Sequence, residues 1–316
     1  MRPFLLLFAF FLLSTTIGVA QEGTFIKSTH TVELDASLKA TVFFKDKFLC
    51  LKADGEMIAI SPTSHKLEGT FQTNTKDVAL HDIFLRNDSL IGVNEKNTYF
   101  LTNENVWKFL KQGRSVPIFY QDKEFTVSIS CSGEWGGSVY FTHNKTKKRY
   151  EAKATCPLTL LKQGNTYIVT ASLAHMIGFT EVISITAPSQ LKPYNRNHLK
   201  KKKVIHVGED ESTSTQGATT LIDTVRVIAI TSFPLDENIY YVLNTNKAVI
   251  ISSIKNGTFK TEDVLRDKRL ASYGPVTMIN GEKRITTFTY GSQAGFLVIE
   301  QNKLDLYLLS PDSRKP

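Results

Sequence analysis

The sequence predicts an all-β protein built from a repeated four-stranded unit, and three observations support this prediction. Apolar or alternating runs of four to eight residues follow one another along the chain, separated by clusters of Asn, Asp, Gly and Lys. This is the pattern of β-strands joined by short hairpins. The runs are rich in Val, Ile, Phe, Tyr and Thr, which pack well on a pleated surface. One kind of turn also returns at a regular interval.

The repeat is clearest at the turn that follows the first strand of each unit. Each such turn is polar or contains glycine and leads into an apolar run, as Asp236 leads into IYYVL. Six residues mark these turns: Asp46, Asn87, Asp122, Gly164, Asp236 and Gly281. Their spacings are 41, 35, 42, 72 and 45 residues. A period of about forty residues is the length of a four-stranded repeat unit.

The one long spacing contains an extra polar segment, residues 188–217. Its low hydrophobicity predicts a flexible insertion of about 30 residues, with one short strand at 203–207. Its lysine run at 200–203 is followed closely by acidic residues that cancel much of the positive field, which favours a solvated loop. Without the insertion the period returns to the low forties.

Each unit also contains a second hairpin and a fourth strand. The turns between second and third strands are expected at 53–55, 94–97, 134–137, 175–178, 244–247 and 291–295. The fourth strands are expected at 67–71, 106–110, 150–154, 203–207, 259–264 and 304–309. Residues 25–34 would pair with the last unit and close a ring.

This pattern resembles the β-propellers, and the resemblance covers nearly the whole chain. Six four-stranded blades fit the repeats best, with counts of five or seven left open because boundaries read from sequence slip by a few residues. A pair of β-sandwiches fits the even spacing less well. The chain lacks the Gly-His and Trp-Asp pairing of WD40 repeats and the Asp-box of sialidases. Trp135-Gly136-Gly137 is similar to the paired glycines of kelch repeats but occurs once.

Residues 1–20 have the pattern of a secretory signal peptide. Arg2 is followed by an apolar stretch rich in Phe and Leu, and Gly18 and Ala20 suit cleavage before Gln21. The mature chain, 21–316, is therefore expected to be a single propeller domain, secreted or periplasmic, without a transmembrane segment. Its oligomeric state is left open.

The net charge of +8 bears on the class of partner. Export argues against nucleic acid, and the basic residues are spread through turns. An anionic glycan or envelope surface fits the charge, and so does an ordinary solvated basic surface.

Three cysteines allow one disulfide and one free thiol. Cys131 would end a second strand and Cys156 would open the next blade, near the same face. A bridge between them and a pair of reduced buried thiols remain equal alternatives. Cys50, inside FLCL, is typical of a core residue.

The candidate binding residues are Trp135, Glu134, His175 and Met176. The repeat phase puts all four on one face of adjacent blades, because loops between second and third strands share a face. A Trp between glycines with a carboxylate beside it suits a sugar ring or a protein partner, although a Trp that caps the blade core is the plainer alternative.

Acid–base chemistry at this face would use Glu134, His175 and Glu181. A lone turn histidine is more often structural, and no histidine or cysteine spacing is typical of a metal site. No cofactor motif is present. The sequence thus favours a non-enzymatic binding module for a protein or glycan. A glycan hydrolase or lyase at the channel mouth, and a structural envelope component, are the alternatives.

Overall fold

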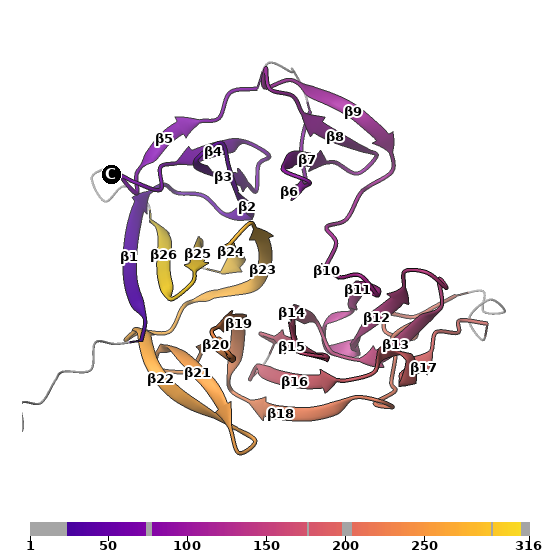
Figure 1. Cartoon of the computed structure of the whole chain (residues 1–316). Coiled ribbons are helices and arrows are strands. Elements are labelled where there is room, and N and C mark those ends of the chain that lie inside the picture. Colours follow the sequence, from indigo (N-terminus) through magenta and orange to yellow (C-terminus); the bar gives the residue numbers. More distant parts are fainter. Residues whose placement is uncertain (1–23, 74–77, 176, 198–203, 292, 311–316) are drawn as a thin grey trace, which may run out of the picture.

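The computed structural model describes residues 24–73, 78–175, 177–197, 204–291 and 293–310, and these form six β-sheets arranged as blades around a central axis (Figure 1). Blade 1 contains β2 (Leu38–Phe44), β3 (Lys47–Lys52), β4 (Met57–Ile60) and β5 (Leu67–Thr70), and blade 2 contains β6 (Asp82–Arg86), β7 (Ser89–Val93), β8 (Asn97–Leu101) and β9 (Trp107–Gln112). Blade 3 contains β10 (Tyr120–Gln121), β11 (Phe125–Cys131), β12 (Gly137–His143), β13 (Arg149–Lys153) and β17 (Lys192–Pro193).

The remaining blades follow the same antiparallel pattern. Blade 4 contains β14 (Pro157–Gln163), β15 (Thr166–Leu173), β16 (Phe179–Ile185) and β18 (Thr219–Val225), and blade 5 contains β19 (Ile228–Leu235), β20 (Asn238–Asn244), β21 (Val249–Lys255) and β22 (Thr258–Arg266). Blade 6 contains β23 (Ser272–Asn280), β24 (Lys283–Gly291), β25 (Gly295–Glu300) and β26 (Lys303–Ser310). The predicted six-bladed β-propeller is confirmed.

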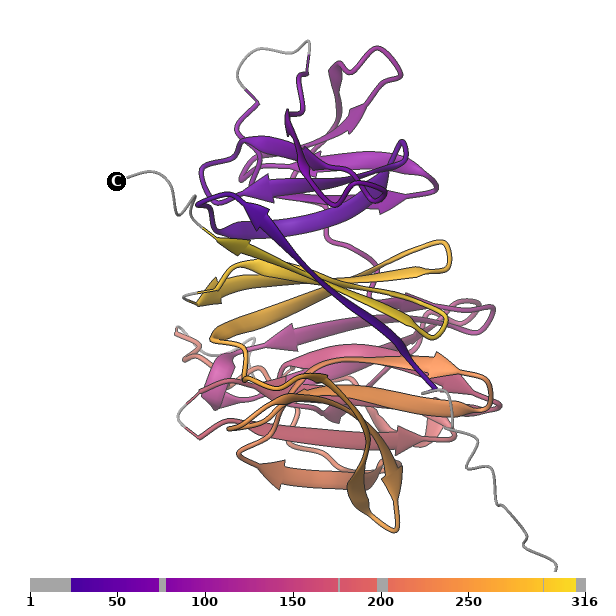
Figure 2. The same ribbon diagram turned by 90° about the vertical axis from the view of Figure 1, so that its left-hand side faces the viewer.

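The N-terminal strand closes the ring. β1 (Ile26–Glu33) runs parallel to β26, from Ile26 opposite Lys303 to Glu33 opposite Ser310, and lies along the outer edge of blade 6 (Figures 1 and 2). The expected pairing of this segment with the last blade is confirmed. The signal-peptide prediction lies outside the described residues.

The fourth strand of blade 4 is not where the sequence placed it. Residues 204–207 form no strand, and β18 pairs with β16 instead. Both segments contain β-branched residues, but only the later one has the length to pair along β16. The insertion therefore leaves blade 4 after its third strand, adds β17 to the outer edge of blade 3 through β13, and returns.

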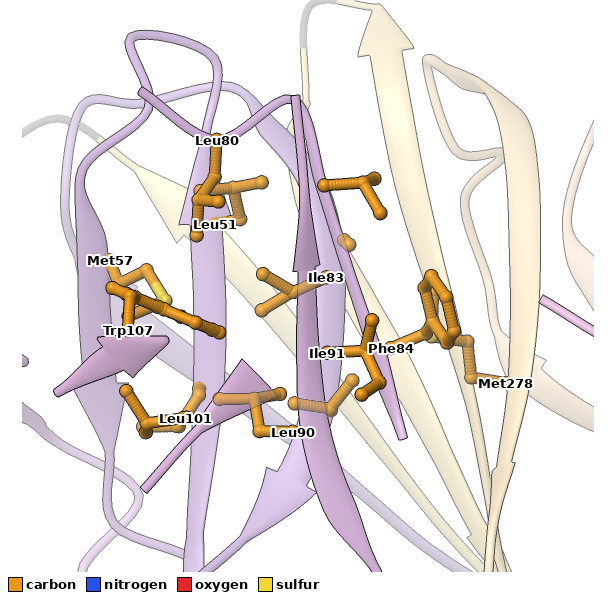
Figure 3. Close-up of a cluster of buried hydrophobic side chains, with 14 of the residues drawn as sticks. Leu51, Met57, Leu80, Ile83, Phe84, Leu90, Ile91, Leu101, Trp107 and Met278 are labelled. Carbon is orange, nitrogen blue, oxygen red and sulfur yellow. The ribbon is translucent and has the colours of Figure 1, made fainter. Parts of the chain in front are cut away.

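Buried apolar side chains fill five of the six interfaces between blades. One cluster packs blade 1 against blade 2 around Leu80, Ile83 and Trp107 (Figure 3). Four others lie between blades 3 and 4, 4 and 5, 5 and 6, and 6 and 1. Within the described ranges, the interface between blades 2 and 3 borders a cavity of about 620 Å³ that is also lined by β14 of blade 4 and by β23 and β24 of blade 6. The ring is thus unevenly packed.

Candidate functional site

Trp135 stands on a tight loop between β11 and β12. The loop contains the short helix η1 (Gly133–Trp135). Gly133 begins this helix and Gly136 follows it, with φ of 64° and 119°, a region that residues other than glycine rarely adopt. The Ser132 N–H donates to the Gly136 carbonyl at 2.8 Å and closes the loop. No side chain of the helix is buried, and Trp135 is 61% exposed. The indole is therefore presented to solvent.

The loop between β15 and β16 meets the Trp135 loop from blade 4. Nδ1 of His175 lies 3.0 Å from Oε2 of Glu134, and both side chains are partly exposed. The Gly178 N–H donates to the His175 carbonyl at 2.8 Å, and the neighbouring Ile177 is 60% exposed. Residues 41 positions apart in the chain thus form one surface. Met176, predicted to bind, lies outside the described residues.

A disulfide joins the two blades beneath this surface. Cys131 ends β11, Cys156 directly precedes β14, and the bridge holds their Cα atoms 4.4 Å apart. Gly137 packs beside it: a Cβ there would lie 2.7 Å from backbone atoms of Cys156 and Ala154. Cys50 is fully buried, and burial raises the pKa of its thiol to about 12, so it stays protonated and unreactive.

The returning half of the insertion packs against the Trp135 loop. The carboxylate of Glu211 accepts hydrogen bonds from the hydroxyls of Ser130, Ser132 and Ser138, the last two at 2.7 and 2.6 Å. Gly208 approaches so closely that a Cβ would lie 2.5 Å from the Trp135 carbonyl oxygen. Sequence reasoning missed Glu211, although three serines at alternate or nearby positions around one glycine loop were a visible signal.

The outgoing half of the insertion is fixed to blade 3 by charge. Glu151 has a side chain that is 1% exposed, and its carboxylate lies 2.9 Å from the Arg196 guanidinium and 3.6 Å from the Lys192 ammonium. Arg196 also donates to the Tyr140 hydroxyl at 3.0 Å. A carboxylate so deeply buried needs such partners. The segment on either side of residues 198–203 is therefore attached to blade 3.

Glu181 does not join the other acid–base candidates. It lies on β16 opposite Ala171 and Asp223, away from the hairpin tip that carries His175. Burial and the nearby Asp223 raise the pKa of Glu181, while Lys153 and the Thr155 backbone oppose the rise. The structure brings Glu134 and His175 together without Glu181.

The cavity beside the channel is lined mainly by apolar side chains. Phe84, Val116, Ile129, Leu158 and Ile279 are among them. The described lining includes two arginines and no Asp or Glu. Hydrolysis of glycosides generally requires a pair of carboxyl groups, so this lining counts against the hydrolase alternative at this site. Across the described ranges, no group of three or more His, Cys, Asp or Glu side chains is arranged to hold a metal ion.

No family model matches the sequence, and no curated protein matches it. Among solved structures, the chain is similar to BamB from Moraxella catarrhalis at 9% identity, covering 82% of this chain and 72% of that one with a TM-score of 0.35. It is also similar to the computationally designed protein Ika8 (9% identity, 88% of each chain, TM-score 0.40) and to the RRP9 WD40 repeats (9% identity, 81% and 88%, TM-score 0.39). Likeness at this level assigns neither a family nor a function.

The architecture defines the broad class. A rigid six-bladed propeller that presents loops on its faces is suited to a binding or scaffold module. Within the part of the chain that the structure describes, no helix is long and apolar enough to cross a membrane.

Proposed function

We propose that this chain is an exported, non-enzymatic binding module that docks a protein partner through the surface around Trp135. This surface, the Trp135 surface, consists of Trp135, Ile177 and Val207, with Glu134 and His175 beside them. The observation that supports the proposal is the 61% exposure of Trp135 on a loop that is fixed from two sides, by the disulfide and by the insertion.

A fixed, exposed Trp is an effective anchor for binding. Its ring offers a large contact area at little cost in conformational entropy, and Trp is enriched among residues that dominate interface energies. The Glu211 hydrogen bonds and the close Gly208 contact keep the backbone under Trp135 in place. Little ordering would then be needed when a partner binds.

The neighbours of Trp135 favour a protein over a glycan. Ile177 is 60% exposed on the His175 loop, and Val207 is 67% exposed next to the Gly208 contact. Exposed aliphatic side chains around an aromatic residue are typical of protein interfaces, whereas a sugar would need more hydrogen-bonding groups. The Glu134–His175 pair supplies a polar rim.

The test is a quantitative pull-down from an extract of exported proteins with the mature chain, Trp135→Ala and the control Phe109→Ala. Phe109 is 60% exposed on β9 of blade 2, so the control removes an equally exposed ring elsewhere. We expect the wild type and Phe109→Ala to retain one protein in similar amounts. With Trp135→Ala, the retained amount should fall at least about ten-fold. Thermal unfolding would verify that both variants fold.

A glycan array run with the same three proteins separates the alternatives. If a glycan bound in a Trp135-dependent way, the ligand of this surface would be a sugar and not a protein. Binding of either kind that survives Trp135→Ala would remove the site from this surface.

A further inference from the structure

We propose that the cavity between blades 2 and 3 is a second binding site, which takes a small apolar molecule ending in a carboxylate and holds that carboxylate on Arg284. The site is independent of the Trp135 surface. It rests on the cavity and on a buried positive charge that the fold leaves unpaired.

The cavity has the size and lining of a ligand site. Its volume of about 620 Å³ falls within the range of typical small-molecule pockets. Apolar side chains come to it from several directions: Phe84 from blade 2, Ile129 from blade 3, Leu158 from blade 4, and Val276 and Ile279 from blade 6. The other five interfaces between blades are filled by the chain's own side chains. Here the protein leaves apolar surface without a covering partner.

The wall between blades 2 and 3 is the connection that runs from β9 to β10. Its Val116 and Ile118 line the cavity and are more than half exposed. Phe84 also packs beside Met278 of blade 6 (Figure 3), and both residues line the cavity. The apolar part of a ligand could therefore cover the exposed connection and contact Phe84 and Met278.

Arg284 gives the cavity its charge. It lies on β24 opposite Ile279 and lines the cavity, yet it is only 9% exposed. No side-chain hydrogen bond or ion pair joins it to another residue in the described ranges. A buried guanidinium without an anion is costly, and burial lowers the pKa of Arg284 to about 10. At neutral pH it remains charged, and it lines the cavity without an anionic partner among the described residues.

A carboxylate fits this arrangement better than a neutral or cationic head group. A guanidinium presents paired N–H donors that match the two oxygens of a carboxylate. The described lining includes no Asp or Glu that would compete for Arg284 or repel an anion, and Arg86 adds a second positive charge. A neutral or cationic head group would leave Arg284 unpaired.

The test is isothermal titration calorimetry with decanoate and with decanol, which has the same chain and no charge. We expect the wild type to bind decanoate saturably and decanol at least about ten-fold more weakly, because a hydrogen-bonded charge pair is lost. Arg284→Met should reduce decanoate binding to the level of decanol. Because it removes an unpaired buried charge, it should also raise the thermal midpoint of the free protein.

Lys283→Met is the matched control. Lys283 is the next residue on β24, and its ammonium is paired with Glu300. Its loss should leave decanoate binding unchanged. Equal affinity of the wild type for decanoate and decanol would overturn the proposal, as would an absence of saturable binding or wild-type affinity in Arg284→Met. The comparison of decanoate with decanol uses only the wild type. It therefore tests the proposal even if Arg284→Met does not fold.

Discussion

Two neighbouring interfaces of the same ring are built in opposite ways. Between blades 3 and 4 the chain places a buried cluster, a disulfide, a network of charged side chains, and an insertion that starts in blade 4 and packs on blade 3. Between blades 2 and 3 it places a cavity bordered by a connection with exposed Val116 and Ile118. Blade 3 is therefore joined firmly on one side only.

This difference separates two requirements that a propeller has to satisfy. A surface that docks a partner must keep its shape, and the Trp135 surface spans the firmly joined interface. A site that admits a small molecule must leave space, and the unfilled interface does so. Because β1 closes the ring at blade 6, the fold does not depend on close packing at every interface.

The largest effect is expected from a core truncation on the firm side. Phe141 is fully buried, and its ring packs against Tyr167 of blade 4 with 5.2 Å between centroids. Phe141→Ala should lower the free energy of unfolding by about 3–5 kcal/mol. Ile118→Ala, at the cavity, should change it by less than about 1 kcal/mol. Chemical denaturation of the two variants measures both, and equal losses would show that the two interfaces do not differ.

Removal of the disulfide should follow. The bridge closes a chain separation of 25 residues, for which the loss of loop-closure entropy corresponds to about 3 kcal/mol. Cys131→Ser combined with Cys156→Ser should lower the stability by that amount. Added reductant should lower the thermal midpoint of the wild type and leave the double variant unchanged, since the remaining Cys50 is buried. If reductant left the thermal midpoint of the wild type unchanged, this would contradict a structural role for the bridge.

The ionic network on the opposite face of the same interface should contribute less. Asp122 accepts hydrogen bonds from the Lys162 ammonium at 2.7 Å and the Tyr167 hydroxyl at 2.6 Å, both in blade 4. It also accepts backbone N–H groups of Glu124 and Phe125. Asp122→Asn should lower the free energy of unfolding by about 1–3 kcal/mol, as measured by chemical denaturation at pH 6.

The pH dependence of this network has a definite sign. Burial opposes ionisation of Asp122, but the hydrogen bonds outweigh it and hold its pKa well below the usual range. The unfolded chain therefore takes up a proton first as pH falls. The contribution of Asp122 is complete above its ordinary pKa of about 4 and is lost progressively at lower pH. The difference between wild type and Asp122→Asn should shrink at pH 3, and a constant difference would contradict this account.

The sequence predicted the blades and the proximity of two loops but not what lies between blades. Turn residues and the alternation of strand residues are local features of the sequence. Gly133, Gly136 and the hairpin residues therefore predict the turns in which they lie. The wrong fourth strand of blade 4 arose because 203–207 and 219–225 both have strand character, and only pairing with β16 decides between them. The three serines lie near one another in the sequence, but Glu211 meets them across more than 70 residues, so no local pattern identifies it as their partner.

Arg284 was hidden for the same reason. It follows Asn280-Gly281-Glu282-Lys283, and a basic residue after such a turn is ordinarily solvated. Its burial depends on side chains from several blades that are distant in the sequence, and no local pattern indicates that they come together.

The smallest effect should come from filling the cavity. Val276 lines it on β23 and is 40% exposed, whereas Val139 is fully buried in the cluster between blades 3 and 4. Val276→Phe should change the free energy of unfolding by less than about 1 kcal/mol because the added ring enters open space. Val139→Phe should cost about 1–3 kcal/mol because it overpacks a full core. Denaturation curves of the two variants give the comparison. Since the added ring at position 276 occupies space that decanoate would use, its binding should weaken while stability holds. A large loss of stability in Val276→Phe would mean that this interface is as tightly packed as its neighbour.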